Sequence, residues 1–290
     1  MSVKGKTVII SSQVAYGYVG GNMTSLVLKL NGQETLAVPT TVLSNHLGFD
    51  TVGGGPISIR TFEGILEGIV RLDVFQHVET IITGFFDSEE QVVLTAAWIN
   101  NLKKKNPTVQ YVCDPVMGDF KDGGLFVSEC VADAITSLLV PLADLLTPNH
   151  FEFERIVGRR LYSRGEMQTA FCDDARLKGK KMVVTGCHLG HEYVQTVNNV
   201  ILDTSGYGYV SNLKVNLDPV GAGDLFTALV CIQLKLQMDF TNAIKNSATM
   251  MVTLINDMLR EGRKEFELID LLKIPMLINN VAAIHKVLMN

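Results

Sequence analysis

Short apolar runs alternate along this chain with longer segments in which apolar residues recur every three or four positions. The short runs predict buried strands, and the longer segments predict helices with one apolar face. We expect the strands at residues 7–11, 36–39, 80–83, 109–113, 144–147 and 182–185. We expect the helices at residues 22–30 (capped by Asn22), 62–72, 89–105, 128–139, 225–236 and 241–259, and in the last thirty residues. This order predicts an α/β fold with a mostly parallel central sheet and helices on both faces.

Two segments do not follow this alternation. Residues 51–59 contain three glycines and a proline, which predicts a mobile loop or a hairpin. Residues 193–210 have a β-rich pattern, with turns expected at Gly206 and Gly208. Neither segment has the composition of a linker, and the sequence contains no internal repeat. We therefore expect residues 1–290 to form a single domain.

The composition narrows the classes of function. Apolar residues make up 47% of the chain and charged residues 19%, as in globular proteins. The net charge of −5 offers no broad positive field for a nucleic acid or an anionic membrane. No apolar stretch approaches the ~20 residues that span a bilayer, and no targeting segment is visible, so we expect a soluble cytoplasmic protein. The five cysteines lie far apart, which predicts reduced, mostly buried thiols and no metal or redox site.

Polar residues and glycines gather where the predicted strands end. In a parallel sheet, ligands bind at the carboxyl ends of the strands, so these residues are candidates for one common site. They are Ser12, Gly84, Asp114, residues 147–149, Thr185 and the turn at residues 221–224.

The turn from Gly221 to Asp224 carries the strongest chemical signal. Gly221 and Gly223 flank Ala222, so the backbone can come close to a ligand, and a long apolar helix follows. The first N–H groups of that helix have no partner within the helix and lie at the positive end of its dipole, which makes an anion site. Asp224 beside this site has two interpretations: a base that faces the bound anion, or the N-cap of an ordinary helix.

Two further acidic segments follow predicted strands. Asp114 stands at the carboxyl edge of the sheet, where a carboxylate can hold a hydrated Mg²⁺; a plain Asp-Pro turn is the alternative. Asn149 and Glu152 stand three apart at a helix start and point to one side, but this pattern is also that of a capping box. Residues 118–124 contain Lys121, two acids and paired glycines, which suits a flexible lid or an ordinary surface loop.

The loop after the first strand, residues 11–21, has the sequence SSQVAYGYVGG. It contains neither the GxGxxG motif of dinucleotide-binding proteins nor the GxxxxGK[ST] motif of the P-loop. Its hydroxyls, amide and aromatic rings suit a neutral, flat, polar small molecule.

Six motifs in this order resemble those of the pyridoxal kinases of the ribokinase superfamily. They are SSQVAYGYVG at residues 11–20, SNH at 44–46, TGF at 83–85, CDPVMGD at 113–119, PLADLLTPNHFE at 141–152 and PVGAGDLF at 219–226. One such motif is weak evidence, whereas six in the right order, over most of residues 8–236, are strong evidence. The resemblance implies a ribokinase-like fold and transfer of the γ-phosphoryl group of ATP to the 5′-hydroxymethyl group of pyridoxal, and it extends to pyridoxine and pyridoxamine as further candidate substrates.

The resemblance also implies roles for individual residues. Asp224 is the base that takes the proton of the substrate hydroxyl, and the amides of Gly221, Ala222 and Gly223 hold the transferring phosphoryl group. The vitamin-binding positions are Ser12, Val19, Leu47, Phe85 and Asp224. The ATP-binding positions are Asp114, Asn149, Glu152, Thr185, Val220, Gly221 and Gly223. Asp114 and Glu152 organise Mg²⁺, residues 119–126 form a lid, the protein is a homodimer, and a requirement for a monovalent cation such as K⁺ stays open.

The sequence departs from the family pattern at positions that contact the substrate. Many members carry SNHTG, and Leu47 replaces the Thr here; many carry Tyr where Phe85 stands. The hairpin usually carries aromatic residues near a glycine, and residues 53–55 here are all glycine. These departures leave open a hydroxymethylpyrimidine kinase of the same superfamily, although SSQVAYGYVG favours pyridoxal. A non-catalytic vitamin-binding protein is a third alternative, and its hallmark would be loss of Asp224 or of the flanking glycines, all of which are present.

Overall fold

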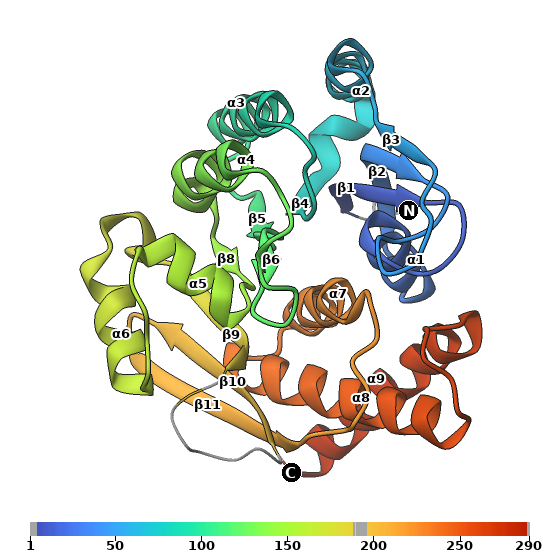
Figure 1. The fold of residues 1–290 in the computed structure, drawn as a ribbon, viewed down its shortest axis with the longest axis vertical. Coiled ribbons are helices and arrows are strands. Elements are labelled where there is room, and N and C mark those ends of the chain that lie inside the picture. Colours follow the sequence, from blue (N-terminus) through green and yellow to red (C-terminus); the bar gives the residue numbers. More distant parts are fainter. Residues whose placement is uncertain (1–4, 188, 190–195, 289–290) are drawn as a thin grey trace.

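The computed structural model describes residues 5–187, 189 and 196–288. Within these residues, nine strands form one sheet in the order β11-β10-β9-β8-β5-β4-β1-β2-β3 (Figure 1). The six inner strands from β9 to β2 are parallel, whereas β10 and β11 at one edge and β3 at the other are antiparallel to their neighbours. The strands are β1 Lys6–Val14, β2 Glu34–Leu43, β3 Gly54–Pro56, β4 Val78–Thr83, β5 Gln110–Cys113, β8 Leu145–Leu146, β9 Lys181–Cys187, β10 Thr196–Asp203 and β11 Gly206–Leu213. A separate hairpin pairs β6 (Gly118–Asp119) with β7 (Gly124–Leu125).

Helices cover both faces of the sheet, as the sequence predicts (Figure 1). One face carries α2 Ile59–Arg71, α3 Glu89–Lys105, α4 Glu129–Ala134, α5 His150–Val157 and α6 Arg164–Asp173. The other face carries α1 Gly20–Leu30, α7 Ala222–Lys235, α8 Phe240–Arg260 and α9 Leu268–Leu288. Single helical turns lie at Asp73–His77, Ile135–Leu139, Val140–Leu142 and Ala175–Leu177. Among the described helices, even the 21-residue α8 and α9 lack a stretch that meets the length and hydropathy of a membrane span.

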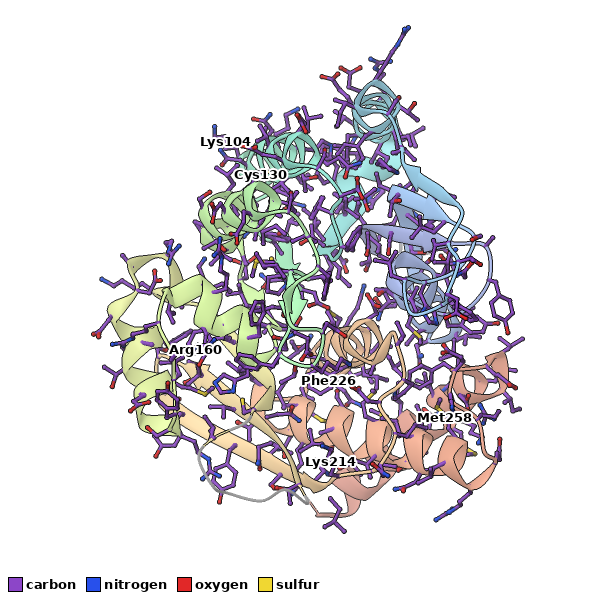
Figure 2. The ribbon with its side chains drawn as sticks, viewed as in Figure 1. Lys104, Cys130, Arg160, Lys214, Phe226 and Met258 are labelled. Atoms are coloured by element: carbon purple, nitrogen blue, oxygen red, sulfur yellow. The ribbon has the colours of Figure 1, made fainter. Side chains whose placement is uncertain are left out.

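Each inner strand feeds two hydrophobic cores because successive side chains point to opposite faces of the sheet. Val8 and Ile10 pack in the core with α2 to α6, whereas Ile9 between them packs in the core with α1, α7, α8 and α9. Phe226 of α7 and Met258 of α8, labelled in Figure 2, are both buried in this second core. A sheet that is covered on both faces leaves only its edges and strand ends for binding.

Some boundaries differ from the prediction. Asn22 does not cap the first helix, which begins at Gly20; its side chain instead bonds to both the N–H and the carbonyl of Val14, at 2.9 Å each, and closes the intervening loop. β2 was expected to end at Pro39 but continues to Leu43. Pro39 pairs with Ser11, next to the place where the pairing of β1 with β2 shifts register, and such a bulge tolerates proline.

The turns and thiols also need correction. Residues 54–56 do form the predicted hairpin with β2, but Gly208 lies within β11 and does not form a turn. Residues 193–195 of the predicted β-rich stretch lie outside the described residues. The cysteines are free, as predicted, but the expectation that most are buried is wrong. Cys113 and Cys187 are buried, Cys231 is partly exposed, and Cys130 and Cys172 are exposed.

Candidate active site

The polar segments that follow β4, β5 and β8 lie side by side at one edge of the sheet. The Gly84 N–H donates to the Ile10 carbonyl (3.0 Å), and the Asp114 N–H donates to the Thr83 carbonyl (3.0 Å). The Thr147 N–H likewise donates to the Cys113 carbonyl (3.1 Å), and Asn149 pairs with Thr185 in a parallel bridge. The strand-to-strand ladder therefore extends past the strand ends and sets the spacing of the predicted site residues. Two of them, Ser12 and Thr185, lie within β1 and β9 and not after them.

Asp224 faces this edge from the start of α7. The N-cap of α7 is Gly221, and Asp224 is the third helical residue, so the interpretation of Asp224 as an N-cap is wrong. Its Oδ2 accepts a hydrogen bond from the Gly20 N–H at 2.8 Å, and a Cβ built on Gly84 would lie 3.9 Å from its Oδ1. The carboxylate is therefore held by a different segment of the chain and points at the strand ends.

The electrostatics of Asp224 suit a base. Burial raises the pKa of this carboxyl from its ordinary value of 3.8 to about 6, while the Gly20 N–H acts in the opposite direction because it stabilises the ionised form. Asp224 is thus more basic than an ordinary aspartate and is still ionised at pH 7.

Gly221 brings the anion-site turn against the first loop. It has φ +87°, and an added Cβ would lie 2.5 Å from the Tyr18 carbonyl and 3.2 Å from Cγ1 of Val19. Only glycine fits this contact without displacing the backbone. The turn therefore places the N–H groups at the start of α7 next to the loop that carries Ser12 and Val19. Among them, the Ala222 N–H donates to the Pro219 carbonyl (3.3 Å).

Ser12 lies close to Asp224. An added Cβ on Gly20 would be 2.3 Å from the Ser12 Oγ, and the Gly20 N–H is 2.8 Å from Asp224 Oδ2. With ordinary backbone dimensions, the Ser12 hydroxyl and the Asp224 carboxylate are at most about 8 Å apart, which is within the span of one small substrate. Val19 is buried beside them and Ser12 is partly exposed.

Asp114 is buried next to Asp224. Its Oδ2 accepts a hydrogen bond from the Thr227 hydroxyl (3.2 Å), which in turn contacts the Thr147 hydroxyl (2.9 Å). Burial, followed by the nearby charges of Glu152 and Asp224, raises the pKa of Asp114 well above its ordinary value. A small cavity of about 10 Å³, roughly the room that one water needs, is lined by both carboxylates and by Ser11, Thr24, Thr83 and Thr227.

Asn149 and Glu152 form the capping box that was one of their two interpretations. The Asn149 Oδ1 accepts from the Glu152 N–H (2.9 Å), and the Glu152 Oε2 accepts from the Asn149 N–H (2.8 Å). Both side chains also hold the base of the β6–β7 hairpin: the Met117 N–H donates to Glu152 Oε1 (2.9 Å), and Asn149 Nδ2 donates to the Gly118 carbonyl (2.7 Å). Burial raises the pKa of Glu152 to about 8, although these backbone N–H groups oppose the shift.

The tip of this hairpin crosses the site. Phe120 packs against Phe151 of α5, and the ammonium group of Lys121 forms an ion pair with Asp218, shortly before the anion-site turn. Residues 118–124 therefore bridge the two sides of the site. Whether they open and close stays a prediction.

The two substrate positions that depart from the family pattern have different surroundings. Phe85 is partly buried; its N–H donates to Ser11 Oγ (3.2 Å) and its carbonyl accepts from the Thr40 hydroxyl (2.8 Å). Leu47 is 59% exposed, in a loop where buried His46 bonds to Glu265 (2.9 Å). Phe85 thus lies at the site, whereas a contact of Leu47 with the substrate stays a prediction.

The sequence reasoning missed three residues that organise this site. Gly20 orients Asp224, Thr227 bonds to Asp114, and Ser11 lines the cavity between the two acids. Thr227 could have been found, because it stands three residues after Asp224 on the same helix face. The role of Gly20 depends on contacts across 204 positions in the sequence, which no local pattern reports.

The arrangement suits a hard cation bound largely through water. Among the described residues, no group of three or more His, Cys, Asp or Glu side chains is placed to hold a metal ion. Two buried carboxylates, Asp114 and Glu152, remain near the site. Mg²⁺ commonly binds through one or two carboxylates, several waters and the phosphates of a nucleotide, so this donor set fits it.

Comparison with known proteins identifies the family. Residues 68–268 match the family model described as phosphomethylpyrimidine kinase. A pyridoxine/pyridoxal/pyridoxamine kinase from Bordetella avium is 32% identical over 84% of this chain and 82% of its own length. The pyridoxal kinase structure from Entamoeba histolytica superposes with a TM-score of 0.85 at 24% identity and covers 95% of this chain and 96% of its own. The structure of the Leishmania donovani pyridoxal kinase, in complex with ADP and pyridoxamine, superposes with a TM-score of 0.79 at 23% identity and covers 92% of each chain. The chain therefore belongs to the phosphomethylpyrimidine kinase family and, within it, to the pyridoxal kinases.

Proposed function

We propose that this protein transfers the γ-phosphoryl group of ATP to the 5′-hydroxymethyl group of pyridoxal, and that pyridoxine and pyridoxamine are further substrates. The observation that carries the proposal is the carboxylate of Asp224, which has a pKa of about 6 and stands beside the glycine turn at the start of α7. The family membership and the Bordetella avium relative, which is named for all three vitamers, support it.

In this proposal Asp224 and the glycine turn act on the same hydroxyl. The hydroxymethyl oxygen attacks the γ-phosphorus, and its proton passes to the Asp224 carboxylate. The bond from the γ-phosphorus to the bridging oxygen of the β-phosphate breaks, and ADP leaves with that electron pair. The amides of Gly221, Ala222 and Gly223 stabilise the charge on the transferring group. Because both groups lie on one turn, the base and the phosphoryl group meet at one hydroxyl.

The nucleotide lies on the other side of the turn. We assign Asp114, Asn149, Glu152, Thr185 and Val220 to ATP; that a nucleotide binds at all is supported by the Leishmania donovani relative, which binds ADP. Asp114 and Glu152 would hold Mg²⁺, which supplies charge neutralisation for the phosphates. Since backbone N–H groups already bond to both oxygens of Glu152, this residue acts on the ion through water.

The vitamin ring is assigned to the pocket between the first loop and the strand ends. Ser12 supplies a hydroxyl for a polar ring substituent, and Val19 and Phe85 supply apolar surface. Leu47 is assigned to the outer rim of this pocket. Phe85 and Leu47 bring no side-chain hydrogen-bond group, so we expect recognition of the ring to depend more on shape and stacking than in relatives that carry Tyr and Thr at these positions.

A turnover assay tests the proposal. ADP release should be measured with pyridoxal, pyridoxine, pyridoxamine and hydroxymethylpyrimidine in parallel. We expect the highest kcat/KM with a B6 vitamer. A preference for hydroxymethylpyrimidine would replace the proposal with the related kinase activity, and vitamin binding without ADP release from any of the four would indicate a non-catalytic binding protein.

Four further expectations stay predictions. They are the single-domain organisation over residues 1–290, the homodimer, the cytoplasmic location and a requirement for a monovalent cation such as K⁺. Size-exclusion chromatography with light scattering and activity in Na⁺ against K⁺ buffers address the second and the fourth.

A further inference from the structure

The turn of the β6–β7 hairpin carries two adjacent side chains that are fixed to opposite sides of the site. The Phe120 ring packs edge-on against Phe151 (5.4 Å between centroids) and His150 (5.6 Å). The guanidinium of Arg160, labelled in Figure 2, lies 5.2 Å from the same ring. These contacts fasten one side of the turn to α5 and its following loop. Lys121, the next residue, forms its ion pair with Asp218, which is 97 positions away in the sequence.

This ion pair closes the hairpin over the nucleotide side of the site. The base of the hairpin is bonded to Glu152 and Asn149, and its tip is bonded to Asp218, which stands three residues before Gly221. A triphosphate that extends from Asn149 and Glu152 to the glycine turn must therefore pass beneath the tip. Lys121 is within reach of that path because its present partner lies beside it.

The charge balance of the site calls for a cation at this place. None of the residues assigned above to ATP is a Lys or an Arg. Phosphoryl transfer depends on neutralising the negative charge of the phosphates. Burial alone would lower the pKa of Lys121, but Asp218, Asp119 and Asp122 together raise it, so the ammonium group is charged at neutral pH.

The Lys121–Asp218 pair is suited to exchange. The side chains are 52% and 65% exposed, and ion pairs between exposed groups contribute little to stability. A lysine is a compact charge on a flexible chain, and a phosphate group carries more negative charge than a carboxylate and competes for it.

We propose that Lys121 changes partners during the reaction, pairing with Asp218 in the free protein and with the β- and γ-phosphates when ATP is bound. The inference rests on the proposed kinase function. It makes Lys121 a phosphate-binding residue and Asp218 a competitor that holds the hairpin down in the absence of nucleotide.

Opposite effects of two substitutions test the exchange. Lys121→Gln should lower kcat/KM for ATP by about 10- to 100-fold. Removal of one hydrogen-bond donor to a developing oxyanion lowers the rate by about 100- to 1,000-fold, and the loss expected here does not exceed the lower end of that range. Asp218→Asn should instead lower the KM for ATP by about twofold, because it removes only a weak exposed competitor. In the Lys121→Gln background, Asp218→Asn should have no further effect. Lys235→Gln is the matched control, because Lys235 forms a comparable exposed pair with Glu79 (3.2 Å) far from these residues.

The alternative is that the ion pair only holds the hairpin in place. In that case both single substitutions would weaken ATP to the same extent, and the double variant would be no worse than either; this result overturns the proposal. An unchanged kcat/KM for ATP in Lys121→Gln also overturns it.

Binding without turnover separates this inference from the kinase function. Calorimetry should show that Lys121→Gln binds the non-hydrolysable analogue AMP-PNP more weakly than the wild type and binds AMP equally well. If the wild type releases no ADP with any vitamer, the proposed function fails, and the AMP-PNP comparison still decides the role of Lys121. Equal affinity of the two proteins for AMP-PNP would refute that role.

Discussion

Replacing Asp224 with asparagine separates a catalytic base from a structural acid. Asparagine keeps the size of the side chain and an oxygen that can accept the Gly20 N–H, which bonds to Asp224 at 2.8 Å, but it cannot take a proton from the substrate. General-base catalysis contributes roughly 10²–10⁴ in rate, so kcat for pyridoxal should fall by about this factor. The affinity for ATP should change little, because the base faces the acceptor hydroxyl.

The same substitution should stabilise the fold. Burial raises the pKa of Asp224 from 3.8 to about 6 although the Gly20 N–H opposes it, so the folded protein holds the proton more tightly than the unfolded chain does. The ionised carboxylate therefore lowers stability above pH 6, and this penalty fades as the pH falls toward 3.8. The difference corresponds to at most about 3 kcal/mol, since one pKa unit is about 1.4 kcal/mol. Asp224→Asn should have a higher Tm than the wild type at pH 7.5 and a similar Tm near pH 4.

The assay combines steady-state kinetics, a pH profile and thermal melting. In the wild type, kcat/KM for pyridoxal should fall about tenfold per pH unit below pH 6, because protonated Asp224 cannot act as a base. Asp239→Asn is the matched control: Asp239 is the N-cap of α8, and asparagine caps a helix as well as aspartate, so rate and Tm should hardly change. If Asp224→Asn retains more than about a tenth of the wild-type kcat, the loss is below the smallest one expected for a general base and the assignment is wrong.

Three further predictions concern the metal, the glycine turn and the lid. Activity should vanish in excess EDTA and return with Mg²⁺, and full turnover in metal-free buffer would contradict the assignment of Asp114 and Glu152. Gly221→Ala should lower kcat by about 10²-fold or more and also lower the Tm, because the added Cβ lies 2.5 Å from the Tyr18 carbonyl and displaces the anion-site amides; wild-type kinetics would show that the turn is not used. Amide hydrogen exchange at residues 118–124 should slow when AMP-PNP binds, and identical protection with and without nucleotide would count against a lid.

The sequence predicted the layered α/β architecture because that architecture has a local signature. Each inner strand is a short apolar run whose successive side chains pack into two different cores, as those of Val8, Ile9 and Ile10 do. Such runs can be recognised in the sequence without knowledge of the fold. Boundaries were less predictable. The first helix begins at Gly20 and not after Asn22, because Asn22 bonds back to Val14, and a polar residue before an apolar run does not reveal which backbone group it contacts.

The candidate site was predictable where its residues follow strands and unpredictable where distant segments meet. Asp114 and Asn149 could be expected to lie together, because consecutive parallel strands bring their ends to one edge. The bond from Gly20 to Asp224 and the ion pair from Lys121 to Asp218 join residues about 200 and 100 positions apart. The dual role of Glu152, which closes a capping box and also holds the hairpin through Met117, was equally hidden, since the motif predicts only the first contact.

Gly20 explains how one site obtains both a positioned base and a substrate pocket. A carboxylate with an ordinary pKa is a weak base, and a fully desolvated one would be protonated at neutral pH and could not act at all. The first loop covers Asp224 and so raises its pKa, while the Gly20 N–H limits the rise to about 6. A side chain at position 20 would strike the Ser12 hydroxyl at 2.3 Å, so only glycine lets the loop approach Asp224 and keep Ser12 in the pocket. The pKa of the base and the position of a substrate contact are therefore set by the same backbone segment, and a change at Gly20 should disturb both together.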